Sequence, residues 1–329
     1  MPDAQFGVAL ENFCPAPAEP SIDAIVAYCA KAEALGFASA WAWDHILLGT
    51  KRPFPFLESL STLTAVAMRT GRLALGVGVL VLPLRNPVVL AKELASLDQI
   101  SNGRLLLGAA AGWYEREFQA CGVPFAERGK IFVRNLEIVR RLWTEDQVDG
   151  TVDRYVFRQA AMRPKPVQRP HPPVLIGGYV DVVLRRVARH GDGWLTYFYT
   201  PESFRGAWAK IRAFAEEAGR DPAGLRNVSQ LPICVAPSFE EADRRIRDFI
   251  GRYFDVAPWS QSTPDSAIRG TAAQCTEQLA AHLDAGVQHI VLVPDGYRPD
   301  QLEVIAHDVL PRLRSPGRDV PPGARPVHA

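Results

Sequence analysis

Eight short apolar stretches recur along the chain, and they alternate with segments whose apolar residues have helical spacing. The apolar stretches span residues 5–10, 38–43, 73–82, 104–108, 174–176, 193–196, 228–236 and 289–293. Continuous apolar runs are typical of parallel strands that are buried on both faces. The alternation is the pattern of a (β/α)8 TIM barrel, whose functional residues lie at the carboxyl ends of the strands. We therefore predict an α/β fold of this class.

Helix-start signals agree with the alternation. Polar residues that favour the N-cap position precede five of the expected helices: Ser21, Asn86, Thr200, Ser238 and Thr271. An open doubly wound sheet is the alternative architecture. It is disfavoured because no GxGxxG motif follows the first expected strand.

Two segments depart from the rhythm. Within residues 146–173, Asp149-Gly150 predicts a hairpin turn, and five prolines between Pro164 and Pro173 predict an extended connector. The long loop from Tyr253 to Gly270 is expected to act as a lid. We expect one barrel domain over residues 1–314, followed by a disordered tail over residues 315–329.

Composition excludes several classes of function. The chain has 329 residues and a formal net charge of +1, which gives no electrostatic reason to expect nucleic acid or a membrane surface as a partner. The five cysteines are scattered and form no CxxC pair, and no secretion signal opens the chain, so a cytoplasmic location is expected. The motifs HExxH and GxSxG are absent. Metal and serine hydrolases are therefore disfavoured, and no metal site is expected.

Residues 105–118 form the stretch that most favours a ligand site. Three leucines lead into residues 108–112, which carry almost no side chain, so a flat ligand could lie against the backbone. Trp113 then supplies a wall. Glu115 and Glu117 fall in the first turn of a helix, where the helix dipole favours negative charge. The same residues would also suit a tightly packed corner that binds nothing.

Three other strand ends carry residues with chemical potential. Asp44-His45 closes the second strand, where a histidine could shuttle a proton near neutral pH; a capping Asp beside a structural His is the alternative. Two glycines within residues 76–79 indicate a bulge or a close backbone approach. Gly177-Gly178 stands before a helix, where free N–H groups could hold a phosphate. We expect these strand ends to converge around one flat, anionic ligand.

Motifs along nearly the whole chain resemble those of the bacterial luciferase-like superfamily. The matching segments around the second to fourth strands are residues 38–45, 75–87 and 97–104. Further segments are similar to the branch that uses the deazaflavin coenzyme F420: residues 112–118, 122–125, 127–129, 163–170, 173–178 and 191–194.

This resemblance implies a (β/α)8 barrel with a flavin-like ring at the carboxyl end of the strands. It implies a set of cofactor-binding residues: Asp44, His45, Gly78, Val79, Ala111, Gly112, Trp113, Gly177 and Gly178. Within that set, the Gly78–Val79 bond matches a non-prolyl cis peptide that forms a bulge behind the ring. The Gly177-Gly178 turn matches a phosphate-binding loop, and His45 is the candidate catalytic residue for proton handling.

The chain departs from the sugar-phosphate dehydrogenases of the superfamily at three positions. Trp113 stands where they carry a glutamate, Gly49 where they carry a tryptophan, and Thr200 where they carry a lysine that binds substrate phosphate. A sugar phosphate is therefore not the expected substrate. Aromatic side chains favour an apolar or aromatic substrate pocket instead: Trp43, Trp113, Tyr197, Tyr199 and Trp259.

These observations favour an F420-dependent oxidoreductase that transfers hydride between C5 of the coenzyme and an apolar or aromatic organic molecule. One alternative is an FMNH2-dependent monooxygenase of the same superfamily, with FMN as the cofactor. A second alternative is a barrel that binds a flavin without catalysing a reaction. The resemblance also makes a homodimer one expectation, although nothing in the sequence indicates which face would pair.

Overall fold

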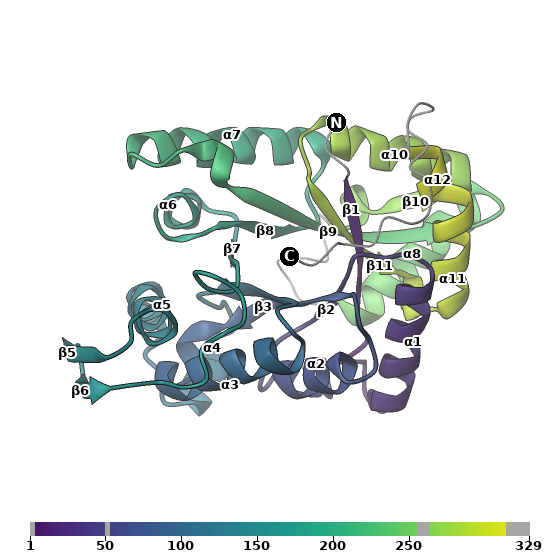
Figure 1. Ribbon diagram of the computed structural model, residues 1–329. Helices are drawn as coiled ribbons and strands as arrows, with labels where there is room; N and C mark the ends of the chain where they lie inside the picture. Colours follow the sequence, from purple (N-terminus) through teal and green to yellow (C-terminus); the bar gives the residue numbers. More distant parts are fainter. Residues whose placement is uncertain (1–3, 50–52, 255–262, 314–329) are drawn as a thin grey trace, which may run out of the picture.

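A closed barrel of parallel strands forms the centre of the protein. The computed structural model describes residues 4–49, 53–254 and 263–313 (Figure 1). Eight parallel strands follow one another around the barrel: β1 (Gln5–Ala9), β2 (Ser39–Ala42), β3 (Ala74–Val81), β4 (Leu105–Ala110), β7 (Val174–Gly177), β8 (Gly193–Tyr197), β9 (Arg226–Val235) and β11 (His289–Pro294). Pairing of β9 with β8 closes the ring. The predicted TIM barrel is confirmed.

Helices surround the barrel, as Figure 1 shows. The longer ones are α1 (Ile22–Ala34), α2 (Ser59–Ala67), α3 (Pro87–Ile100), α5 (Arg128–Thr144), α6 (Asp181–His190), α7 (Pro201–Glu217), α8 (Phe239–Tyr253) and α10 (Ala272–Asp284). Shorter helical segments are α4 (Glu115–Ala120), α9 (Thr263–Ser266), α11 (Pro299–Val304) and α12 (Leu310–Leu313), and a π-helical turn (Ile305–Val309) joins the last two.

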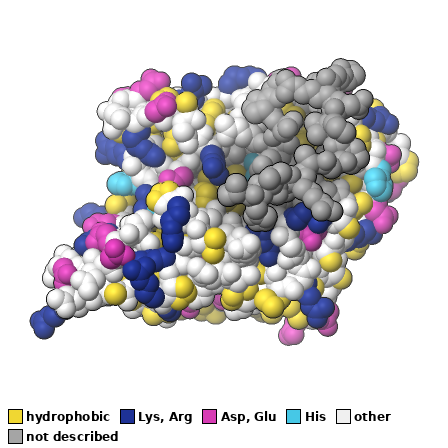
Figure 2. All heavy atoms as spheres, in the orientation of Figure 1, with side chains coloured by type: hydrophobic (Ala, Val, Ile, Leu, Met, Phe, Trp, Pro, Cys, Tyr) yellow, Lys and Arg dark blue, Asp and Glu magenta, His cyan; other side chains and the backbone are white. Residues whose placement is uncertain are grey.

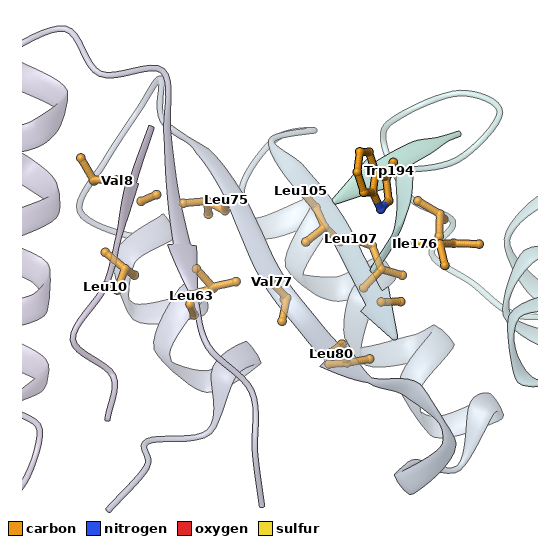
Figure 3. Close-up of a cluster of buried hydrophobic side chains, with 14 of the residues drawn as sticks. Val8, Leu10, Leu63, Leu75, Val77, Leu80, Leu105, Leu107, Ile176 and Trp194 are labelled. Carbon is orange, nitrogen blue, oxygen red and sulfur yellow. The ribbon is translucent and has the colours of Figure 1, made fainter. Parts of the chain in front are cut away.

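The main hydrophobic core lies between the strands and these helices. Figure 3 shows part of it, with Val77 and Leu107 from neighbouring strands beside Leu63 from α2. Residues that alternate with these along the strands point to the opposite face, which in a closed barrel is the interior. Ala40 belongs to the outer layer, for example, and Trp41 belongs to a second buried cluster.

Trp41 fills the barrel interior near its amino-terminal end. A Cβ on Gly76 would lie 2.2 Å from the indole ring, so only glycine leaves room for the ring at this position. The indole N–H donates to the Ser39 hydroxyl at 2.7 Å, and that oxygen lies 2.8 Å from Nε2 of His289. The close backbone approach predicted for the glycines of the third strand is therefore confirmed.

All five predicted helix caps are confirmed by their hydrogen bonds. The side chains of Ser21, Asn86, Thr200 and Ser238 each accept from a backbone N–H in the first turn of the following helix. Thr271 and Gln274 form a complete, reciprocal capping box.

The structure corrects two predictions about the interrupting segments. The hairpin exists as β5 (Val148–Val152) and β6 (Tyr155–Ala160), but Asp149-Gly150 lies inside β5 and the turn falls at Asp153-Arg154. Gly150 instead takes a positive φ of 103° beside a register shift in the hairpin, which explains the glycine without a turn.

The described part of the predicted loop from Tyr253 to Gly270 contains regular elements. Tyr253 ends α8, and residues 263–270 contain α9 and the strand β10 (Ile268–Gly270), which pairs with β9. Residues 255–262 and the predicted tail lie outside the described residues, so the lid role stays a prediction. Among the described residues, no helix has the length and apolar character needed to cross a bilayer.

Candidate functional site

Four adjacent strands bring the predicted ligand-binding residues to one side of the barrel mouth. The strands β2, β3, β4 and β7 are consecutive neighbours in the sheet. A Cβ on Gly177 at the end of β7 would lie 2.8 Å from a methyl group of Val79 in β3. A Cβ on Gly112, just beyond β4, would lie 2.7 Å from both Val81 and Phe118. Close contacts therefore join the strand ends that the sequence predicts to converge.

Glycine is required at Gly112 for two reasons. Its φ of 82° lies in the left-handed region, which side chains rarely adopt, and a Cβ would also meet its neighbours. Gly178 likewise has a φ of 140°. Glycine at these positions therefore lets the backbone beyond β4 and β7 pack closely against neighbouring side chains.

The peptide bond between Gly78 and Val79 is cis, as the resemblance implies. The pairing of β3 with β4 shifts register between Val77 and Leu80, so a bulge stands at this bond. On the interior side, the amide Nε2 of Gln230 lies 2.4 Å from where a Cβ of Gly78 would be. Gln230 is buried and its Oε1 has no hydrogen-bond partner among the described residues.

His45 forms a hydrogen-bonded pair with Glu117 at the barrel mouth. Nδ1 of His45 lies 3.0 Å from Oε2 of Glu117, and the two side chains are 10% and 1% exposed. The other carboxylate oxygen accepts from the backbone N–H of Ile46 and, at 3.0 Å, from that of Leu47. Burial raises the pKa of Glu117, but the bonds from His45 and the two backbone groups outweigh it and lower the pKa below its ordinary value.

This pair defines what the imidazole can do. An ionised carboxylate only accepts hydrogen bonds, so Nδ1 carries the proton that it shares with Glu117. Nε2 is then the nitrogen that can accept or donate a proton, and it has no partner among the residues of the described ranges. The rings of Trp113 and Phe56 both meet His45 edge-on, each with centroids 5.8 Å away, and hold the imidazole plane.

Asp44 is bound on every side by the protein. Its carboxylate accepts two bonds from the guanidinium of Arg85, at 2.9 and 2.6 Å, together with one from the Ser59 hydroxyl and one from the Val81 N–H. These bonds tie the end of β2 to the end of β3. Asp44 thus braces the site, and a direct contact between its carboxylate and a ligand stays a prediction.

The turn at Gly177-Gly178 leads into an uncapped helix. The N-cap residue of α6 is Val180, and no side chain accepts a bond from the first turn. By contrast, the starts of α1, α2, α3, α7, α8 and α10 each have a side-chain acceptor. The carbonyl of Gly178 accepts from the Trp194 indole at 3.0 Å, which fixes the turn. Free N–H groups at a helix N-terminus suit a phosphate.

Aromatic side chains cover the other side of the mouth. Trp43 stacks on Tyr197 with ring centroids 6.1 Å apart and also contacts Phe13 and Phe254. Burial holds the pKa of Tyr197 well above its ordinary value, so this phenol stays neutral.

The other residues expected in the substrate pocket fall in different places. Tyr199 stacks on Tyr179 and meets Trp194 edge-on at 5.3 Å, so it belongs to the packing near α6 and α7. Trp113 lies beside His45 and Tyr114. Trp259 lies outside the described residues. No three His, Cys, Asp or Glu side chains within the described ranges gather into a group that could hold a metal ion.

The sequence reasoning missed the roles of Glu117 and Arg85. Glu117 does lie in the first turn of α4, where the dipole favours it, but its principal contact is His45, which lies 72 positions earlier in the chain. Arg85 belongs to a motif used for the resemblance, and its pairing with Asp44 spans 41 positions. The only signal in the sequence was the position of an acidic residue, Glu117, in the first turn of a predicted helix.

Comparison with known proteins gives three findings. The sequence profile of the family described as luciferase-like monooxygenase matches residues 5–289. An F420-dependent glucose-6-phosphate dehydrogenase from Amycolatopsis mediterranei is 27% identical over 322 residues, which are 89% of this chain and 95% of that protein. An FMNH(2)-dependent dimethylsulfone monooxygenase from Pseudomonas putida is 32% identical over 262 residues, which are 70% of this chain and 71% of that protein.

Among solved structures, the monooxygenase RslO1 from Streptomyces bottropensis superposes with a TM-score of 0.81 at 24% sequence identity. The match covers 94% of this chain and all of that one (100%). At this identity the likeness concerns the fold alone.

Proposed function

Because the chain belongs to the luciferase-like monooxygenase family and is an oxidoreductase of that family, we propose that its coenzyme is the deazaflavin F420. The proposed reaction transfers hydride between the coenzyme and an apolar or aromatic organic molecule. When bound, the deazaflavin supplies the hydride chemistry at its C5 atom. The observation that carries the proposal is the buried His45–Glu117 pair, because a hydride transfer to or from a carbon that bears oxygen also needs a residue that moves a proton.

We use the word cradle for the expected cofactor-binding residues at the ends of β3, β4 and β7, and this cradle fits a coenzyme of this type: Gly78, Val79, Ala111, Gly112, Trp113, Gly177 and Gly178. The cis peptide at Gly78–Val79, the backbone of Ala111 and Gly112, and the Trp113 ring would lie against its tricyclic ring. The backbone of Gly177 and Gly178 and the uncapped start of α6 would hold its phosphate. The glycines keep these backbone segments close together, and no side chain caps the first turn of α6, where an anion would bind.

His45 would hold or release the proton at Nε2. The ionised carboxylate of Glu117 accepts the Nδ1 proton and fixes the orientation of the imidazole. The surrounding aromatic rings exclude water from the imidazole. Asp44 and Arg85 hold the backbone that carries His45.

The aromatic side of the mouth supports an apolar or aromatic substrate. The dehydrogenase from Amycolatopsis acts on glucose 6-phosphate by its name, but the position where such enzymes carry a phosphate-binding lysine is Thr200 here. The Thr200 side chain caps α7 by accepting from the Ser203 N–H. The stacked rings of Trp43 and Tyr197 offer an apolar surface, whereas a phosphorylated sugar would need a positively charged group.

The second candidate is an FMNH2-dependent monooxygenase, and the dimethylsulfone monooxygenase relative favours it. Both coenzymes present a flat ring and a phosphate, so the cradle accepts either. The test is to purify the chain from a host that makes both coenzymes and to identify the bound molecule by mass spectrometry, followed by titration of the empty protein with each. We expect the deazaflavin to copurify and to bind much more tightly than FMN. Preferential copurification of FMN would reverse the assignment.

A further inference from the structure

Two arginines lie together beyond the phosphate end of the cradle. Arg128 is the first residue of α5, and Arg186 lies in the second turn of α6. Nη2 of Arg186 is 2.7 Å from the position that a Cβ on Gly129 would take, so its guanidinium packs against the first turn of α5. The Phe132 ring lies below it, with the guanidinium carbon 5.4 Å from the ring centre. Two positive groups therefore meet at the start of α5.

Neither arginine has an acidic partner among the residues that the structure describes. Nearby arginines do: Arg140 pairs with Asp192, and Arg185 pairs with Glu217. Arg128 donates only to the backbone carbonyls of Gly112 and Phe125, at 3.2 and 3.0 Å. The pKa of Arg186 is lowered, first by burial and then by the positive charge of Arg128. The protein thus keeps two like charges close together, partly buried and uncompensated, which favours an external anion.

The local backbone adds to the same field. The helix α5 has 17 residues and no side-chain cap at its N-terminus; the turn at Phe125–Glu127 accepts the Arg128 N–H, and the helix dipole adds positive potential beside the two guanidinium groups. The carbonyl of Gly112 joins Arg128 directly to the cradle. Figure 2 shows Lys and Arg side chains over α6 and close to α4 and α5, on the left of the view. If a ligand has its phosphate at the start of α6, an acidic group attached beyond that phosphate would lie close to these two arginines.

We propose that Arg128 and Arg186 bind the carboxylates of an acidic chain attached beyond the coenzyme phosphate. The inference rests on the proposed function, because the deazaflavin extends past its phosphate into a chain of glutamates, whereas FMN ends at its phosphate. The planar guanidinium group pairs with carboxylates through two parallel hydrogen bonds. This arginine pair therefore selects the deazaflavin over FMN through the tail and not through the ring.

Equilibrium titration of the whole protein tests the proposal with three probes: the deazaflavin with its glutamate tail, its tail-less phosphate fragment, and FMN. Coenzyme fluorescence gives each dissociation constant at low and at high salt. We expect wild type to bind the tailed form several-fold more tightly than the tail-less one, and salt to narrow that difference. Arg186→Gln weakens binding of the tailed form by about fivefold and leaves the tail-less form unchanged.

Arg185→Gln is the matched control, since Arg185 is the neighbouring residue on α6 and is already paired with Glu217. It leaves all three affinities unchanged. Arg186→Lys restores part of the lost affinity, because it keeps the charge without the fork geometry. Thermal melting of each variant confirms that it is folded.

The possible failures are distinct. Equal weakening of the tailed and tail-less forms by Arg186→Gln would assign the arginines to the phosphate and overturn the inference. Equal binding of both forms by wild type would overturn it while leaving the proposed function intact. A wild-type protein that binds FMN and neither deazaflavin form would overturn the proposed function itself, and the inference with it.

Discussion

The two sides of the barrel mouth are built from different material. On the side of β3, β4 and β7, the surface is backbone and small residues, with a cis peptide at Gly78–Val79 and a left-handed Gly112. Across from it, aromatic rings form the surface, where Trp43, just beyond β2, stacks on Tyr197 at the end of β8. A surface of backbone has few ways to rearrange, whereas a surface of side chains is easily altered by substitution. The contrast suits a site that holds one fixed coenzyme and a separate organic substrate.

His45 stands at the border between the two sides, and its removal should have the largest effect. His45→Ala is expected to lower kcat by roughly 100- to 10,000-fold, the range for loss of a general acid or base, while coenzyme affinity changes little. Steady-state kinetics and coenzyme titration measure the two quantities. His307→Ala is the control, because His307 is exposed on the far helix. Unchanged turnover would remove the catalytic role from His45.

The backbone side is tested by adding a single methyl group. Gly112→Ala combines a left-handed φ with a Cβ 2.7 Å from Val81 and Phe118, so it should cost about 3 kcal/mol of unfolding free energy. It should also weaken coenzyme binding by more than tenfold.

Gly122→Ala separates strain from crowding in this experiment. Gly122 has a φ of 67°, but nothing lies within 4 Å of the position of its Cβ. That variant should cost about 1 kcal/mol and leave coenzyme binding unchanged. Urea unfolding and coenzyme titration compare the pair. If the two variants behaved alike, the backbone cradle would have no special role.

Glu117→Gln keeps the shape of the buried side chain and removes its charge. We expect kcat to fall about tenfold and the unfolding free energy at pH 7 to fall by about 2 kcal/mol, because charge-assisted bonds to His45 and to two backbone groups are weakened. Glu115→Gln on the same helix, where Glu115 is exposed, is the control.

The pH dependence of the Glu117 effect has a definite sign. The pKa of this carboxyl is lower in the folded protein than its ordinary value of 4.5, so its stabilising contribution is complete above about pH 4.5 and is lost as the pH falls through the folded pKa. The difference in stability between wild type and Glu117→Gln should therefore shrink on acidification. A difference that grew instead would contradict the assignment.

The aromatic side should show the smallest effect. Tyr197→Leu removes one stacked ring and is expected to raise KM about fivefold with little change in coenzyme affinity. Tyr199→Leu is the comparison, because the stacking partner of Tyr199 is Tyr179, whereas Tyr197 stacks on Trp43. Equal effects of the two variants on KM would show that the aromatic side extends further than the contacts indicate.

Much of the fold could be predicted because local patterns and global architecture agree. Helix caps such as Asn86 and Thr271 act within a few residues, so the sequence alone reveals them. The misplaced hairpin turn has the opposite explanation. Asp149-Gly150 has the composition of a tight turn, but the glycine is needed for a bulge, and Asp153 supplies the positive φ of the turn.

The candidate site was harder to predict, because its key pairs join distant parts of the chain. Glycines near strand ends are visible in the sequence, and their contacts confirm close approach at Gly112 and Gly177. The partner of His45 could not be found in the same way. Glu117 satisfies the local rule for a helix start, and only tertiary packing shows that it serves the histidine.

The indole of Trp41, which fills the amino-terminal part of the barrel, limits the routes by which ligands can enter. With Trp41 wedged against Gly76 and hydrogen-bonded toward His289, the passage along the barrel axis is shut at its amino-terminal end. A coenzyme and a substrate that bind inside this barrel would therefore both have to enter from the carboxyl-terminal mouth.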